Sequence, residues 1–168
     1  MPPPSTARLR FGEWTREDFD RAWSLYGDIE VTHLFGGPFT REQVQARLDR
    51  EVANLATRGV QYWPLFLIEN DDFVGACGLR PHDEILALGF HLRPQHWGRG
   101  YATEAARAVI DFAFERAGIA SIFAGHHPNN ERSKRALESL GFRYWKHNFY
   151  EPTGLQHPGY LLHRSAGF

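Results

Sequence analysis

A segment just past the middle of the chain, Phe90–Ala105, combines residue types that bind phosphate groups. Gly98 and Gly100 carry no side chain, so a ligand can approach the backbone closely at both positions. A helix is expected to begin directly after them. The free N–H groups of its first turn and the helix dipole would then favour a bound anion. Arg99 adds a charge-assisted donor, so the segment predicts a pyrophosphate-binding site.

Two common phosphate-binding motifs do not fit this segment. A P-loop ends in Gly-Lys followed by Ser or Thr, and the chain has no such sequence. The dinucleotide fingerprint needs a third Gly or Ala where this chain has Thr103, and it opens the first βα unit of a domain. Here the loop follows several predicted strands instead. A plain strand-to-helix turn without a ligand is the remaining alternative.

The elements that must position this segment alternate along the chain. Capping residues and apolar residues repeated every three or four positions predict helices at 15–26, 40–57, 99–117 and 130–139. Apolar runs between turn signals predict strands at 7–11, 61–69, 73–79, 84–92, 121–126, 142–150 and 159–164. The expected fold class is α/β (α+β), with a mixed, mostly antiparallel central sheet of about seven strands flanked by about four helices.

Length and composition fit one soluble domain. The 168 residues predict a single domain over 1–168, with residues 1–6 flexible. A formal net charge of −1 argues against a nucleic-acid partner, and no apolar stretch is long enough to cross a membrane. The N-terminus lacks the features of a signal peptide, so a cytoplasmic location is expected. Cys77 is the only cysteine, and we interpret it as a structural thiol. The nine histidines complete no metal-ligand spacing, so no metal site is expected.

The phosphate-binding segment resembles a known family. Gln95–Gly100 reads Gln-x-x-Gly-x-Gly and is similar to motif A of the GNAT N-acetyltransferases. Residues 92–105 further resemble the RimJ/RimL-like branch, the ribosomal-protein N-terminal acetyltransferases, which favours Trp-Gly-x-Gly-Tyr-Ala-Thr-Glu-Ala. Asn130–Ser133 and Leu140–Phe142 resemble that branch's Asn-x-x-Ser and Leu-Gly-Phe. The resemblance extends over nearly the whole chain.

The resemblance implies an acyltransferase that moves the acetyl group of acetyl-CoA directly to a primary amine, on a protein N-terminus or a small molecule. The loop amides would bind the pyrophosphate, and the pantetheine arm would lie between strands 86–92 and 121–126. A backbone N–H of residues 89–92 would polarise the thioester carbonyl. The implied cofactor-binding residues are Phe90, His91, Leu92, Gln95, Trp97, Gly98, Arg99, Gly100, Tyr101, Ala102, Asn130 and Ser133.

The sequence differs from the family pattern at the position of the general base. The attacking amine must lose a proton, and many relatives carry a Glu where this chain has Ala87. His91, Glu84 and Asp83 are the substitutes, and we select His91 as the candidate catalytic residue. The structural alternative is an ordinary histidine of a sheet.

The sequence also differs from the family pattern at the group that protonates the leaving thiolate. Many GNAT enzymes use a Tyr where this chain has Leu137, so Ser133 is the second candidate catalytic residue. A serine that merely sits in the first turn of a helix is the structural alternative. A non-catalytic acyl-CoA-binding module and a transferase for a longer acyl-CoA are the alternative functions.

The acceptor side gives weaker signals. In relatives the first two helices and their loop border the acceptor, so residues 32–39 are expected to do so here. The four arginines of the second predicted helix and its end are interpreted as a solvated face: Arg41, Arg47, Arg50 and Arg58. Both a monomer and a homodimer are left open, with strand 159–164 as the element that would pair between subunits.

Overall fold

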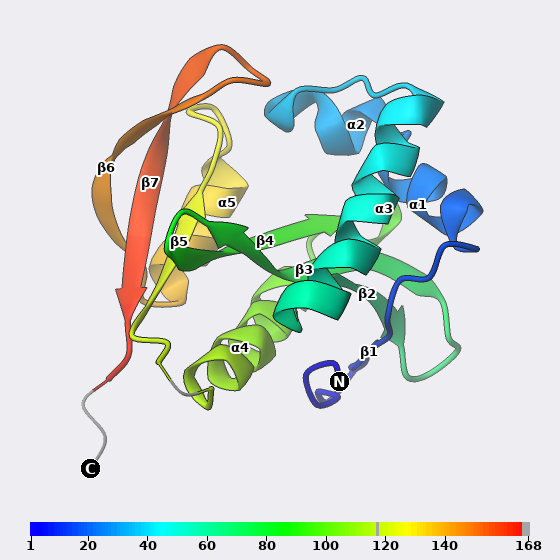
Figure 1. Ribbon diagram of the computed structural model, residues 1–168, viewed down its shortest axis with the longest axis horizontal. Coiled ribbons are helices and arrows are strands. Elements are labelled where there is room, and N and C mark those ends of the chain that lie inside the picture. Colours follow the sequence, from blue (N-terminus) through cyan, green and yellow to red (C-terminus); the bar gives the residue numbers. More distant parts are fainter. Residues whose placement is uncertain (117, 166–168) are drawn as a thin grey trace.

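The computed structural model describes residues 1–116 and 118–165. Its centre is one seven-stranded sheet with the strand order β1-β2-β3-β4-β5-β7-β6 (Figure 1). The strands are β1 (Leu9–Phe11), β2 (Tyr62–Leu67), β3 (Phe73–His82), β4 (Ile85–Leu92), β5 (Ser121–Gly125), β6 (Arg143–Tyr150) and β7 (Leu155–His163). Neighbouring strands are antiparallel except for β4 and β5. The predicted fold class is therefore confirmed.

The described residues form five α-helices, one more than expected. They are α1 (Phe19–Tyr26), α2 (Ile29–Thr32), α3 (Arg41–Arg58), α4 (Tyr101–Phe114) and α5 (Glu131–Ser139). The additional helix α2 has only four residues, too few for an apolar repeat to reveal it. The helix predicted at 99–117 corresponds to α4, which ends at Phe114, and its predicted last residue, Ala117, lies outside the described residues. Within the described part of the chain, no helix has the length and apolar character to cross a membrane.

Each face of the sheet carries its own core. Successive side chains of a strand point to opposite faces, so β2 serves both. Trp63 and Leu65 join the core under α4, whereas Tyr62 and Phe66 join the core under α1 and α3. Fully burying one such apolar side chain contributes about 1.5–3 kcal/mol. The two cores fix α3 and α4 on opposite faces of the same strands.

The sheet separates into two parts between β4 and β5. Among the described residues, these parallel strands pair only at Leu86–Ile122 and Ala87–Phe123. Beyond that point β4 continues to Leu92 while it stays paired with β3 on its other edge. Figure 1 shows β4 and β5 diverging in this way near the middle of the molecule. The second half of β4 therefore has one unpaired edge.

The C-terminal strand is not an edge of the sheet. β7 lies between β5 and β6 and pairs antiparallel with both. Because both of its edges are used within the chain, the prediction that strand 159–164 pairs with another subunit is wrong. The strand with a free edge at this end of the sheet is β6.

Candidate active site

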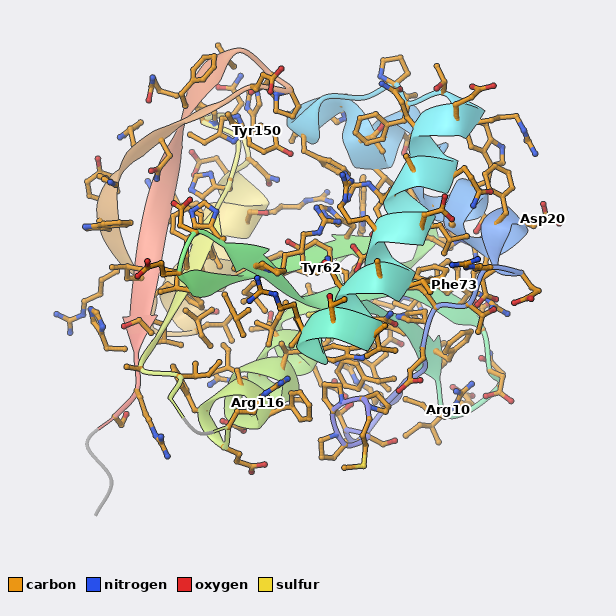
Figure 2. All side chains as sticks on the ribbon, viewed as in Figure 1. Arg10, Asp20, Tyr62, Phe73, Arg116 and Tyr150 are labelled. Carbon is orange, nitrogen blue, oxygen red and sulfur yellow. The ribbon has the colours of Figure 1, made fainter. Side chains whose placement is uncertain are left out.

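A cavity of about 880 Å³ lies where β4 and β5 diverge. Its walls come from the second half of β4, the loop before α4, the first turns of α5, the β6–β7 hairpin and the segment from α2 to α3. Tyr62 on β2 and Tyr150 at the end of β6 both line it, and both are labelled in Figure 2. The cavity thus spans both parts of the divided sheet.

The loop before α4 presents free backbone amides to one end of the cavity. Gly98 and Gly100 have φ angles of 75° and 79°, a region that side-chain-bearing residues rarely adopt. No acceptor among the described residues binds the N–H groups of residues 98–103. The helix dipole of α4 adds positive potential at the same place. This arrangement fits an anionic group such as a pyrophosphate.

The unpaired edge of β4 continues from that loop. The Arg93 N–H donates to the Val74 carbonyl of β3, so alternate N–H groups, those of Phe90 and Leu92, point away from β3. The Trp97 indole donates to the Leu92 carbonyl at 2.8 Å and ties the loop to the strand. These exposed backbone groups suit an extended ligand with amide bonds, which would add to the sheet as a further strand does.

The start of α5 forms the wall opposite this edge. The Asn130 side chain accepts from the Ser133 N–H at 3.1 Å and caps the helix, and both residues line the cavity. The Arg132 guanidinium lies 4.7 Å from the Trp97 ring and joins this wall to the loop. Leu137 is buried and also lines the cavity, at the position where the family pattern has a tyrosine.

His91 lies on β4 among aromatic rings. Its ring centroid is 4.3 Å from Phe35, 5.7 Å from Tyr26 and 5.9 Å from Tyr62. This burial, together with the positive charges of Arg47 and Arg80, holds the pKa of His91 well below its usual value. The imidazole is therefore neutral at pH 7 and can accept a proton.

A buried ion pair supports the floor of the site. The Glu51 side chain is 1% exposed and one of its oxygens accepts from Arg80 at 2.7 Å. Its other oxygen accepts from the Tyr62 N–H at 2.7 Å. The Arg80 guanidinium also lies 4.2 Å from the Tyr62 ring. The pair fixes α3 against β2 and β3 beneath the cavity.

The interpretation of the four arginines of α3 as a solvated face is wrong for Arg47. Arg41, Arg50 and Arg58 are exposed, but Arg47 is only 8% exposed and lines the cavity. Its guanidinium lies 4.7 Å from the Tyr26 ring and 5.4 Å from the rings of Phe35 and Phe39. Aromatic residues of α1 and of the segment between α2 and α3 bury Arg47. Because these residues lie outside α3, the helical repeat of α3 gives no sign of this burial.

Ten of the twelve expected cofactor-binding residues line the cavity. The exceptions are Gln95 and Arg99, whose side chains are exposed on the loop. Both candidate catalytic residues, His91 and Ser133, line it. Asp83 and Glu84 are exposed in the turn between β3 and β4 and do not line it. Phe35 also lines it and lies within residues 32–39, the range expected to border the acceptor. The site further contains residues that the sequence did not indicate: Arg47, Tyr62, Arg80, Tyr150 and His157.

Cysteine and histidine side chains also occur in and near the site. Burial raises the pKa of the Cys77 thiol, which keeps it protonated and unreactive. His126, His127 and His157 line the cavity, and burial and the two neighbouring histidines lower the pKa of His157 to about 4. Within the described residues, no group of three or more His, Cys, Asp or Glu side chains could hold a metal ion.

Known proteins are similar to this chain in sequence and in fold. Residues 8–143 match the family described as acetyltransferase (GNAT) domain. The chain is 31% identical over 147 residues to p20 of Bacillus licheniformis, an uncharacterized N-acetyltransferase, covering 82% of this chain and 80% of that protein.

Solved structures of acetyltransferases superpose over almost the whole chain. An acetyltransferase from Agrobacterium tumefaciens strain C58 matches with a TM-score of 0.85 at 24% identity, covering 98% of this chain and 95% of the other. RimL, a ribosomal-protein acetyltransferase solved in complex with coenzyme A, matches with a TM-score of 0.78 at 12% identity, covering 95% and 96%. Because the family match covers most of its length, the chain belongs to the GNAT acetyltransferase family and is an acyltransferase.

Proposed function

We propose that the protein transfers the acetyl group of acetyl-CoA directly to a primary amine, and that both substrates meet in the cavity between β4 and β5. The observation that supports this most is the joining of two features in one cavity. The free amides of residues 98–103 suit the pyrophosphate, and the unpaired edge of β4 suits the pantetheine arm.

The same edge of β4 supplies the hydrogen-bond donors that activate the thioester carbonyl. The N–H groups of Phe90 and Leu92 point into the opening. Both residues belong to the segment 89–92, which is expected to supply the N–H that polarises the thioester carbonyl. Negative charge develops on that oxygen as the amine attacks, and a fixed donor stabilises the charge more in the transition state than before it. Removing one such donor in other acyl-transfer enzymes costs about 10²–10³ in rate.

His91 is proposed to accept the proton of the attacking amine. An alkylammonium ion cannot attack, because its nitrogen has no free electron pair. The amine becomes more acidic as its C–N bond to the acetyl carbon forms, so a neutral imidazole of low basicity can take the proton at that stage. The open side of the cavity lets the proton pass on to water.

Ser133 is proposed to donate a hydrogen bond to the sulfur as the C–S bond breaks. Ser133 lines the cavity in the first turn of α5, and the Asn130 side chain holds this turn in place by accepting from the Ser133 N–H. Leu137 cannot perform this role because it has no polar atom. The thiolate leaves as free CoA once it is protonated, and the products are CoA and the N-acetyl amine.

The alternatives differ from this proposal in ways that can be measured. A longer acyl-CoA would need room beside His91 and Ser133, and a comparison of acetyl-CoA with longer acyl-CoA donors tests that directly. A cytoplasmic location, where acetyl-CoA is available, and a monomer or a homodimer are compatible with the proposal.

The test is to mix the protein with acetyl-CoA and a panel of primary amines and N-terminal peptides and to follow the release of free CoA thiol. We expect release that depends on the amine, and a loss of about 10- to 100-fold in kcat for Ser133→Ala. Ser139→Ala, on the exposed end of α5, is the matched control. Tight acetyl-CoA binding without amine-dependent release would instead favour a binding module. Failure to bind any CoA would overturn the assignment of the cavity.

A further inference from the structure

Arg47 is a buried cation without an anionic partner. Its side chain is held by the rings of Tyr26, Phe35 and Phe39, and it is 8% exposed. Within the described residues, no carboxylate lies within salt-bridge distance of it and no hydrogen bond from it is found. A buried charge is costly unless a counter-charge compensates it. The rings stabilise the guanidinium through their faces, but they do not neutralise it.

The nearest carboxylate on the same helix is already engaged. Glu51 follows Arg47 by one helical turn, yet one of its oxygens binds Arg80 and the other binds the Tyr62 N–H. The acidic residues that line the cavity, Glu30 and Glu131, are both exposed. One buried arginine, Arg47, and one partly buried arginine, Arg80, thus face a single buried acid, and this end of the cavity carries an excess positive charge.

The position of Arg47 relates it to the acceptor and not to the coenzyme. The free amides of residues 98–103 begin α4, and α4 and α5 share one core, whereas α3 packs in the other core on the opposite face of the sheet. Arg47 and His91 instead contact the same two rings, those of Tyr26 and Phe35. A small molecule can therefore reach both side chains at once, with its amine near His91.

We infer that the acceptor is a small primary amine that also carries a carboxylate, and that Arg47 binds this carboxylate. The inference rests on the proposed function and names the substrate class of the same site. A planar guanidinium matches a carboxylate with two parallel hydrogen bonds. Cationic amines without an acidic group are disfavoured, because they would bring further positive charge next to Arg47 and Arg80.

The positive charge of Arg47 also affects His91. It is one cause of the low pKa of His91, after burial. A carboxylate bound to Arg47 would offset that charge, so the pKa of His91 rises when the correct acceptor binds. The histidine then becomes a better base only in the complex that is ready to react. This coupling gives a second measurement that does not depend on turnover.

The experiment compares matched acceptors. Acetyl transfer is measured for α- and ω-amino acids, for their amides, for alkylamines of equal length and for aminoalkyl phosphonates. We expect the carboxylates to have the highest kcat/KM, and Arg47→Gln to reduce their advantage over the amides by about 10- to 100-fold. Arg47→Lys keeps part of the advantage because it keeps the charge without the planar fork. Arg58→Gln, exposed at the end of the same helix and outside the cavity, leaves the advantage unchanged.

Binding to the protein–CoA complex is measured in parallel by calorimetry, with the His91 titration followed by NMR. The preferred amino acid should bind, and it should raise the pKa of His91 in the unsubstituted protein but not in Arg47→Gln. Equal kcat/KM for amides and acids, a preference for phosphonates, or no binding of any amino acid would each overturn the inference while acetyl-CoA binding stands. A protein that binds no acetyl-CoA would refute the proposed function itself.

Discussion

The cavity is proposed to bind the coenzyme at one end and the acceptor at the other, and these two ends are built in different ways. The coenzyme end uses backbone groups from one continuous stretch, the second half of β4 followed by the loop and the start of α4. The acceptor end uses side chains from separate elements: Arg47 and Glu51 on α3, Tyr62 on β2 and Arg80 on β3. One end is thus determined by local conformation and the other by long-range packing.

This difference has a consequence for specificity. Backbone amides and a helix N-terminus bind any phosphate group of suitable size, so the coenzyme end can stay the same while acceptors vary. The charges and rings of the acceptor end, in contrast, distinguish one amine from another. Substitutions at the two ends should therefore affect different measurements, and three of them test this separation.

The largest effect is expected from Glu51→Gln. The change leaves Arg80 without its counter-charge, and breaking a buried ion pair in this way lowers the free energy of unfolding by about 3–5 kcal/mol. The partial exposure of Arg80, 22%, places the expected loss at the lower end, about 3 kcal/mol. Chemical denaturation measures the change. For the protein that remains folded, acetyl-CoA affinity should stay within about twofold, a difference of less than about 0.4 kcal/mol.

Two controls accompany this variant. Glu17→Gln changes an exposed acid and should alter the stability by less than about 0.5 kcal/mol. The double variant Glu51→Gln/Arg80→Gln removes the unpaired charge and should recover part of the loss. If Glu51→Gln weakened acetyl-CoA binding as strongly as it weakened the fold, the two ends would not be independent.

A medium effect is expected from Gly98→Ala at the coenzyme end. A methyl group at this position meets no atom within 4 Å, so only the φ of 75° opposes it, at a cost of about 1–2 kcal/mol. The loop relieves that strain by turning its amides away from the ligand. We expect acetyl-CoA affinity, measured by calorimetry, to fall by about 10-fold.

Gly118→Ala is the matched control for that change. Gly118 has a φ of 85° and equally open surroundings, but it does not line the cavity. The control should lose similar stability and keep its full affinity for acetyl-CoA. Equal affinity losses in both variants would show that general strain, and not the position of the loop amides, weakens binding.

The same division explains what the sequence could predict. Strand periodicity and turn residues located all seven strands, since these signals are local. Motif A and Asn-x-x-Ser lie in contiguous segments, so most of the residues expected at the coenzyme end do line the cavity. Arg47 could not be assigned from α3 alone, because Tyr26, Phe35 and Phe39 bury it from outside that helix. Tertiary contacts of this kind leave no periodic signal.

Helix beginnings show the same limit at a smaller scale. Thr40 caps α3 as expected, and its hydroxyl and the Gln43 side chain form a reciprocal capping box. The helix predicted to begin at residue 15 begins instead at Phe19, so Thr15 does not cap it. The Asp18 carboxylate instead accepts from the Thr15 N–H and hydroxyl, forming a turn before the helix. Both threonines are followed by sequences that can begin a helix. Thr40 caps its helix because its hydroxyl accepts a hydrogen bond from a backbone N–H, whereas the Thr15 hydroxyl donates to a side chain.

The smallest effect is expected from Glu104→Gln, which tests whether the coenzyme end also depends on contacts remote in sequence. The Glu104 carboxylate, in the first turn of α4, accepts from Thr6 at 2.6 Å and from the Arg8 side chain. Partial burial opposes its ionisation, but these hydrogen bonds outweigh it and lower the pKa of Glu104. Because solvent screens the charge of this group, we expect Glu104→Gln to lower the free energy of unfolding by about 0.5–1 kcal/mol at pH 7.

The pH dependence of that loss identifies its origin. Because the pKa of Glu104 is lower in the folded than in the unfolded protein, its contribution is present above the unfolded value. It disappears as the pH falls through the folded one. Urea denaturation of both proteins between pH 7 and pH 3 should thus show a difference that shrinks on acidification. A difference that is constant with pH would come from packing, and residues 1–8 would then hold α4 without help from this charge.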